Sequence, residues 1–428
     1  MKQMKMSNLD LDLFYEKLEN GLEVYMIPKK NCNNTYVTYS TKYGSRDYEF
    51  VPLGNKKMKK VPLGVAHFLE HKMFEQEDGT DPFAFFSERG ADANANTNYT
   101  KTTYLFSGTQ FLEENLRYLL EYVEAPFFTD DNVEKEKGII EQEIMMYEDN
   151  PYNKAYEGLL YNIFIEDAIK YPIIGTVESV RSITKQDLYE CYHTFYHPSN
   201  MFVVITGKVE PYEAIKVIQE VESKRALTDA KPVEKKKIKE PVEVEKEYEK
   251  RKMTVTIPKL SIGYKIPLAP FKNLSRRKIL HYLMMLFDIK LGPVSLFQEQ
   301  LKKEGLMTTD FAFDYIDTED YFIVMLIAET EEPEKVTTLV NQELSNLELS
   351  ENDLNRKRKT LISSFLFMSD NIYSLNEKAM NNVIKYGKVN CDDYEEIKEL
   401  NISEYKKMIP NINLNNHSTY VIMPKKGK

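Results

Sequence analysis

The pattern of hydrophobic and polar positions predicts a chain in which short strands alternate with helices. Apolar or alternating runs that favour strands occupy residues 22–28, 35–40, 91–97, 102–107 and 201–207. Helical periodicity and helix-end signals occupy residues 64–74, 81–90, 112–125, 130–149 and 211–223. This mixture indicates an α+β fold.

The second half of the sequence repeats features of the first half. The matching segments are residues 128–137 with 349–358, 183–187 with 402–405, 202–206 with 419–423 and, more loosely, 63–73 with 277–287. A repeat of this length predicts two copies of one α+β unit. The alternative is two unrelated domains that share similar helix-start signals.

Residues 224–250 separate the two copies. This segment is dense in lysine and glutamate and has few aromatic residues, which is typical of a solvated linker. We therefore expect an N-terminal domain at residues 1–223 and a C-terminal domain at residues 251–428.

Composition narrows the class of partner and the compartment. The net charge of −10 in 428 residues disfavours nucleic acid, because phosphate binding needs a surplus of lysine and arginine on one surface. The three cysteines are far apart and form no Cys-x-x-Cys pair, which favours a reducing compartment. The sequence pattern gives neither a signal-peptide core nor a transmembrane run, so we expect a cytoplasmic protein without a membrane span.

Candidate chemistry begins with the segment His67-Phe68-Leu69-Glu70-His71. On a helix, His67 and His71 lie one turn apart on one face, and Glu70 lies on the adjacent flank. The pattern His-x-x-Glu-His is the inverted zincin signature, in which both histidines bind zinc and the glutamate acts as general base. The motif supplies two of the three protein ligands that a catalytic zinc site needs.

The helix predicted over residues 130–149 offers a third ligand. At about 100° per residue, Glu143 falls in the middle of an apolar arc and Glu136 falls beside it. The apolar residues of this arc are Ile139, Ile140, Met146 and Tyr147. A carboxylate within a buried stripe is costly unless it is paired or binds a metal, so Glu143 is the predicted third ligand and Glu136 a supporting residue. The alternative is a glutamate that forms a salt bridge in the core.

In the register of the repeat, the second copy lacks these groups. The residues opposite Glu143, Glu70 and His71 are Ser364, Met284 and Met285. We therefore expect the first copy alone to hold a metal.

Three segments together resemble the insulinase/pitrilysin, or inverzincin, family of zinc peptidases. They are residues 67–71, 136–143 and 175–180. The resemblance covers nearly the whole chain and is strongest to small bacterial members related to mitochondrial processing peptidase. It implies two homologous α/β-sandwich halves, each a mostly antiparallel sheet with helices packed on one face. The charged linker would join the halves in a clamshell-like arrangement.

The resemblance also implies roles for the site residues. His67, His71 and Glu143 would hold one Zn2+ per chain. Glu70 would activate water for peptide hydrolysis, and Glu136 would support the catalytic site. These roles agree with the choices made above from helical geometry.

The family binds its peptide substrate as an added strand. The motif at which it does so is similar to Asn94, Ala95, Asn96 and Thr97. The resemblance therefore implies that these residues form the substrate-binding edge. The alternative is an ordinary exposed strand edge.

One departure from the family affects the second half. Active single chains of the family usually carry an arginine just before a glycine and a tyrosine three residues after it, where this chain has Glu304 and Thr308. We therefore expect the peptide clamp to come from a partner of similar fold, in a hetero- or homodimer that encloses one chamber. The predicted function is a zinc metalloendopeptidase that cleaves peptides or unfolded segments. The alternative is a non-catalytic subunit that binds peptides or assembles a complex.

Overall fold

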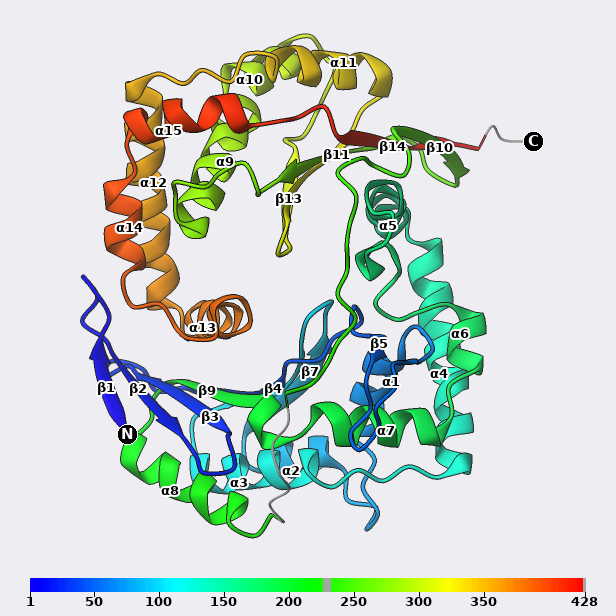
Figure 1. The fold of residues 1–428 in the computed structure, drawn as a ribbon, viewed down its shortest axis with the longest axis vertical. Helices are drawn as coiled ribbons and strands as arrows, with labels where there is room; N and C mark the ends of the chain where they lie inside the picture. Colours follow the sequence, from blue (N-terminus) through cyan, green and yellow to red (C-terminus); the bar gives the residue numbers. More distant parts are fainter. Residues whose placement is uncertain (226–231, 426–428) are drawn as a thin grey trace. The chain divides into compact units, whose positions relative to one another are not determined.

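The computed structural model describes residues 1–225 and 232–425 and divides the chain into two compact units (Figure 1). The first unit comprises Met1–Ile144, Pro172–Lys237 and Phe365–Asp393. The second unit comprises Met145–Tyr171, Ile238–Ser364 and Tyr394–Lys428. Each unit is built around one large mixed sheet.

The sheet of the first unit has the strand order β1-β2-β3-β9-β4-β8-β7. The strands are β1 (Lys2–Lys5), β2 (Asp12–Lys17), β3 (Glu23–Pro28), β4 (Thr35–Thr41), β7 (Ala91–Thr97), β8 (Thr102–Gly108) and β9 (Met201–Gly207). Strands β3 and β9 are parallel, and the other neighbours are antiparallel. The short strands β5 (Glu49–Phe50) and β6 (Lys59–Lys60) form a separate pair. Strand β7 therefore lies at one edge of the large sheet.

Helices from the first half of the sequence cover one face of this sheet. They are α1 (Val65–Lys72), α2 (Pro82–Glu88), α3 (Leu112–Val123), α4 (Asp130–Asp149), α6 (Val177–Arg181), α7 (Lys185–Phe195) and α8 (Pro211–Glu222), with the 3-10 turn η2 (Pro198–Asn200). Strand residues such as Val24 and Val37 share one buried core with helix residues such as Leu116 and Ile140. The buried apolar residues of α1 belong to the same core.

The other face of the sheet receives a helix from the second half of the sequence, α13 (Ile372–Tyr386). Successive strand residues point to opposite faces, so Tyr25 and Val204 pack against α13 whereas their neighbours face the first core. Asn376 of α13 donates a hydrogen bond to the carbonyl oxygen of Val204 (3.0 Å) and accepts one from Thr38 Oγ1 (2.8 Å). Figure 1 shows α13 beside β9.

The sheet of the second unit repeats this strand order, as β10-β14-β11-β13-β12. The strands are β10 (Tyr248–Met253), β11 (Lys259–Pro267), β12 (Ala312–Asp317), β13 (Tyr321–Glu329) and β14 (His417–Pro424). Strands β10 and β14 are parallel and the other neighbours antiparallel, as in β3-β9-β4-β8-β7. The prediction of an α+β fold with two similar halves is therefore confirmed.

The helices of the second unit include one from the first half of the sequence. The helices are α5 (Pro151–Ile163), α9 (Arg276–Leu291), α10 (Leu296–Lys303), α11 (Pro333–Glu343), α12 (Glu351–Asp370), α14 (Asp393–Glu399) and α15 (Ile402–Met408), with turns η1 (Ala168–Lys170) and η3 (Ile409–Asn411). Helix α5 packs directly on β11 and β14: a Cβ atom on Gly263 would lie 2.4 Å from Ile163 Cδ1, and one on Gly158 would lie 2.3 Å from the ring of Tyr420. Glycine permits this close approach.

The compact units do not follow the order of the two copies along the chain. Residues 145–171 join the second unit, and residues 365–393 join the first. Each sheet therefore packs against a helix from the other half, in addition to the helices predicted on one face. The predicted domain boundaries, 1–223, 224–250 and 251–428, describe the order of the two copies along the chain and stay a prediction.

The predicted linker is attached to both units at its described residues. Lys235 bridges to Phe50, and its Nζ atom donates to Asp47 Oδ2 (2.8 Å) in the first unit. Glu240 pairs with Lys265 (2.6 Å) in the second unit. Residues 226–231 of the linker lie outside the described residues. The composition of the segment predicts a solvated linker, whereas its described residues 232–250 include side chains that are bound to the two units.

One described helical segment, Arg276–Lys303, is long and apolar enough to cross a membrane by length and composition, although the sequence pattern predicted no such run. Of the most apolar 18-residue window of this segment, 56% is buried inside the protein. Helix α9 within it has 16 residues, whereas a membrane span needs about 20. Buried core helices pass the same test, so the segment is weak evidence for a membrane span.

Candidate metal centre

Helix α1 carries His67, Glu70 and His71. The helix begins after Gly64, whose φ of 87° and close approach to the Ile174 carbonyl, 2.3 Å from where a Cβ would lie, require glycine. Its apolar residues Val65, Ala66, Phe68 and Leu69 are buried in the core of the first unit. This burial leaves the two histidines on the opposite face of α1, one turn apart.

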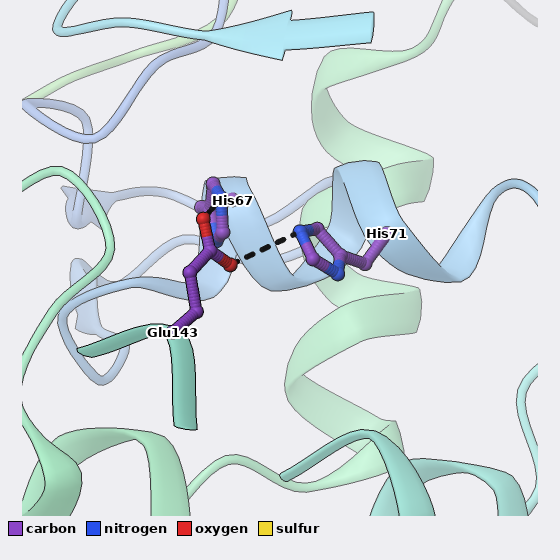
Figure 2. Close-up of side chains that lie close together, drawn as sticks. All are labelled: His67, His71 and Glu143. Carbon is purple, nitrogen blue, oxygen red and sulfur yellow. Dashed lines mark ion pairs between the residues drawn. The ribbon is translucent and has the colours of Figure 1, made fainter. Parts of the chain in front are cut away.

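Helix α4 places Glu143 opposite the two histidines (Figure 2). Glu143 Oε1 lies 3.9 Å from His67 Nε2, and Glu143 Oε2 lies 3.6 Å from His71 Nε2. One ligand atom from each of the three residues falls within 4.8 Å of the other two. Two ligand atoms on one tetrahedral zinc lie about 3.4 Å apart when each bond is about 2.1 Å. The donor set and its spacing therefore fit a zinc ion.

A second carboxylate on α4 orients His71. Glu136 Oε1 lies 3.0 Å from His71 Nδ1, and its side chain is mostly buried. An ionised carboxylate only accepts, so Nδ1 carries the proton and Nε2 presents its lone pair toward Glu143. His67 differs, because its buried Nδ1 has no hydrogen-bond partner among the described residues. The two predicted histidine ligands are thus held in different ways.

Burial and neighbouring charges shift the pKa values of the two histidines in opposite directions. Burial lowers the pKa of His67 to about 3, and the nearby His71 adds to this effect. Burial also opposes the charged form of His71, but the hydrogen bond and charge of Glu136 outweigh it and raise the pKa of His71. His67 is therefore neutral, as a metal ligand must be, whereas a proton competes for His71.

Glu70 lies beside the donor set without belonging to it. Its side chain is buried, and burial raises the pKa of Glu70, although a hydrogen bond from Thr97 partly offsets the effect. Thr97 Oγ1 donates to Glu70 Oε2 at 2.5 Å. The sequence placed Thr97 only on the substrate strand. No sequence signal links it to Glu70, because the contact arises from tertiary folding.

The predicted apolar arc on α4 is wrong in part. Ile140 is buried, but Ile139 and Met146 are 50% and 61% exposed, and Tyr147 is also exposed. The buried stripe of α4 consists of Asn132, Val133, Ile140 and Ile144. Glu136 and Glu143 lie beside this stripe and are partly buried. The helical wheel centred the arc on Glu143, whereas contact with the core favours the flank that holds Ile140 and Ile144.

The predicted substrate residues Asn94, Ala95, Asn96 and Thr97 form the second half of edge strand β7. Asn94 and Asn96 are exposed, whereas Ala95 and Thr97 are partly buried. One side of β7 pairs with β8, and the other side has no strand partner among the described residues. The substrate role of these residues stays a prediction. Glu304 and Thr308, at the altered clamp positions, are exposed residues of the second unit.

Two family models match the chain. The model described as insulinase (peptidase family M16) matches residues 50–177, which include all the predicted site residues. The model described as the peptidase M16 inactive domain matches residues 182–361. The second match begins within the first half of the chain and ends in the second half.

Proteins similar to this chain are named as zinc proteases or peptidases. An uncharacterized zinc protease of Bacillus subtilis, YmfH, is 44% identical over 338 residues, which is 78% of each chain. The structure of a putative M16-like peptidase from Alicyclobacillus acidocaldarius matches 98% of this chain and 100% of its own, with a TM-score of 0.91 and 30% identity. The periplasmic protease PqqL of Escherichia coli matches 99% of this chain with 48% of its own, at a TM-score of 0.74 and 17% identity. The PqqL structure is a likeness of fold alone. Given 44% identity to YmfH over most of both chains, the protein belongs to the insulinase family, peptidase family M16.

Proposed function

We propose that the protein is a zinc-dependent endopeptidase that hydrolyses peptides or unfolded segments, with one Zn2+ per chain held by His67, His71 and Glu143. The observation that carries this proposal is the convergence of the three donors beside Glu70, a buried carboxylate outside the donor set. The zinc protease names of the relatives support zinc as the metal. A purely structural role would give no reason to bury Glu70 beside two histidines.

The residues of the chain divide the chemistry between them. Zinc bound there would supply a Lewis acid and would lower the pKa of a water molecule in its open position to about 7. Glu70 accepts the proton of the attacking water and delivers it to the nitrogen of the leaving amine. The raised pKa of Glu70 makes its carboxylate a better proton acceptor. Glu136 holds the ring of His71 in the orientation that the ligand role needs.

Strand β7 is the proposed substrate-binding edge. Its open side offers backbone N–H and C=O groups to an extended peptide, which would add to the sheet as a further strand. Thr97 at the end of β7 contacts Glu70, so a peptide bound along Asn94–Thr97 would pass the general base. This arrangement favours cleavage within a peptide over removal of a single terminal residue.

A partner of similar fold is the second part of the proposal. Glu304 and Thr308 stand where active single chains of the family usually have arginine and tyrosine. PqqL is about twice as long as the segment that this chain matches, which supports a second copy of this architecture as the partner. The hetero- or homodimer would enclose one chamber.

The free thiols of Cys32, Cys191 and Cys391 support a cytoplasmic location.

A non-catalytic subunit is the competing proposal. The match of residues 182–361 to the peptidase M16 inactive domain favours it, as do the altered clamp positions. The donor set in the first unit argues against it. Zinc content and zinc-dependent cleavage distinguish the two functions.

Digestion of a mixed peptide library, followed by mass spectrometry, tests the proposal. The wild type should cleave at internal positions, lose cleavage on chelation and regain it with added zinc. Glu143→Gln should bind less zinc and cleave more slowly, whereas Glu134→Gln, an exposed glutamate of the same helix, should behave as wild type. A chain that binds a homologous partner but leaves every peptide intact, with zinc bound, would favour the non-catalytic subunit.

A further inference from the structure

We propose that Thr97 is a positioning residue for Glu70. This inference rests on the proposed peptidase function and assigns to Thr97 a role besides that of a substrate-strand residue. Its hydroxyl donates to Glu70 Oε2 at 2.5 Å, which is within the range of a charge-assisted hydrogen bond. The bond joins edge strand β7 to helix α1 within the first unit.

The hydrogens in this cluster can be assigned by counting donors. Thr97 Oγ1 is the donor in its bond to Glu70 Oε2, so the single hydroxyl hydrogen of Thr97 goes to Glu70. Thr102 Oγ1 lies 3.2 Å from Thr97 Oγ1 and 3.0 Å from the carbonyl oxygen of Tyr43. Its hydrogen goes to one of these two acceptors, and in either case the hydrogen of Thr97 stays on Glu70. The geometry thus leaves Thr97 one role as a donor.

The position of the Thr97 hydroxyl is fixed by the turn that follows β7. Thr97 pairs with Thr102 across the hairpin, and Asn98 N–H donates to the Lys101 carbonyl at 2.9 Å. Asn98 Oδ1 accepts from the Thr100 and Lys101 N–H groups, both at 2.9 Å. Lys101 is buried and pairs with Glu377 at 2.8 Å. These contacts hold the hairpin end, and with it the Thr97 hydroxyl, in one place.

The loop that precedes the motif helix packs against the same turn. Ser45 N–H donates to the Asn98 carbonyl at 3.0 Å. A Cβ atom on Gly44 would lie 2.4 Å from the Asn98 carbonyl oxygen, so the loop approaches closely because it carries glycine there. The donor to Glu70 therefore comes from a rigid part of the first unit.

A fixed donor selects one orientation of the Glu70 carboxylate. The terminal torsion of a glutamate is broad, so an unheld carboxylate samples many orientations. With Oε2 held by Thr97, Oε1 is the oxygen left to accept a proton from water. Loss of the hydroxyl should therefore lower kcat, because fewer molecules have the carboxylate in the productive orientation.

Three variants test this role on the full chain loaded with zinc. Thr97→Val keeps the shape of the side chain and removes the hydroxyl, whereas Thr97→Ser keeps the hydroxyl. The control Thr103→Val removes a different buried hydroxyl of the same hairpin, which forms a hydrogen bond with Ser40. Thr97→Val should lower kcat about ten- to a hundredfold with KM nearly unchanged, while Thr97→Ser should stay within a few-fold of wild type. Thr103→Val should keep the wild-type kcat. Zinc per chain should match wild type in Thr97→Val, because Glu70 is not a metal ligand.

Specific outcomes would overturn the inference. A wild-type kcat in Thr97→Val, or a raised KM with unchanged kcat, would show that the hydroxyl does not position Glu70. Lost zinc or no rescue of kcat by Thr97→Ser would make the role structural. If Thr97→Val does not fold, Thr97→Ala takes its place with the same expected kcat. Retained turnover in Glu70→Gln would instead remove the proposed function itself. An inactive Glu70→Gln beside a fully active Thr97→Val would remove only the inference about Thr97.

Discussion

His71 meets two carboxylates through its two ring nitrogens. Nδ1 lies 3.0 Å from Glu136 and Nε2 lies 3.6 Å from Glu143. The first contact holds the proton on Nδ1, and the second directs the lone pair of Nε2 into the donor set. His67 has no comparable support at Nδ1 among the described residues. We therefore expect His71 to govern how the metal site responds to pH.

Zinc affinity should fall as the pH falls through the raised pKa of His71. A proton on Nε2 excludes the metal, so the affinity should drop about tenfold for each pH unit below that pKa. Glu136→Gln removes the charge that raises the pKa, so its drop should begin at a lower pH. Its affinity near neutral pH should nevertheless be about ten- to a hundredfold weaker, because the ring is less well oriented. Competition against a fluorescent zinc chelator between about pH 5.5 and 8 measures both effects.

Glu134→Gln is the matched control for this titration. Glu134 is exposed on the same helix and pairs with Lys137 rather than with a histidine. It should follow the wild-type curve. The same pH dependence in wild type and Glu136→Gln would contradict the role of Glu136.

The residues of the site were predictable to different extents. His67, Glu70 and His71 follow from a local motif, because helix geometry alone places their side chains together. The apolar arc that predicts Glu143 is largely exposed, whereas Glu143 itself lies 3.9 Å from His67 Nε2 and 3.6 Å from His71 Nε2. The contact of Thr97 with Glu70 was not predictable, because it joins residues 27 positions apart that meet only after the sheet has formed.

At the scale of elements, each half of the sequence contributes one helix that packs on the sheet of the other half. Helix α5 packs on the sheet of the second unit, and α13 packs on the sheet of the first. Periodicity predicted β3, β4, β7, β8 and β9 and the helices at residues 112–125, 130–149 and 211–223 to within a few residues, but it missed β1 and β2. It could not predict the exchange, because an apolar stripe shows which face of a helix is buried but not which sheet buries it.

Glu240 attaches the predicted linker to the second unit. Its carboxylate accepts hydrogen bonds from the N–H groups of Ile165 (2.9 Å), Glu166 (2.9 Å) and Asp167 (2.7 Å), and pairs with Lys265 at 2.6 Å. Both side chains of the ion pair are almost fully buried. Glu240→Ala leaves the buried charge of Lys265 without its paired carboxylate and three N–H groups without their acceptor, so the free energy of unfolding should fall by about 3–5 kcal/mol. Denaturant unfolding of the full chain measures this loss.

The exposed linker residue Glu245 supplies the control for Glu240. Glu245→Gln should leave the unfolding curve unchanged within about 0.5 kcal/mol. Burial opposes the charge of Glu240, but the bonds from Lys265 and the backbone outweigh it and lower the pKa of Glu240. The contribution of Glu240 should therefore be present above its unfolded pKa of about 4.3 and be lost as the pH falls through the folded value. Equal stability of wild type and Glu240→Ala would contradict this attachment.

At the scale of the whole molecule, two units of equivalent topology differ in chemistry. Among the described residues, the group able to hold a metal lies in the first unit. The repeat, the α+β class and the family were predictable, because the motifs at residues 67–71 and 136–143 are specific and both halves keep the same order of elements. The compact units were not predictable, because they depend on which halves of the chain contribute α5 and α13.

The altered clamp positions give a prediction for the whole molecule. Peptide cleavage by the chain alone should be slow and should rise when a homologue that carries the arginine and tyrosine is added. The double variant Glu304→Arg with Thr308→Tyr should raise the rate of the chain alone, whereas Glu299→Arg on the exposed face of α10 should not. Equal cleavage rates with and without the partner, at micromolar concentration, would remove the need for a partner.

The central claim is that this chain uses Glu70 beside a zinc held by His67, His71 and Glu143 to hydrolyse peptides. Glu70→Gln tests it most directly, because the change removes the general base and leaves the three donors in place. Zinc per chain and the rate of peptide cleavage should be measured on the same preparation, with any partner that the wild type needs. The account predicts one zinc per chain, as in wild type, and a cleavage rate lowered by at least about a hundredfold. Cleavage at the wild-type rate by zinc-loaded Glu70→Gln would contradict it.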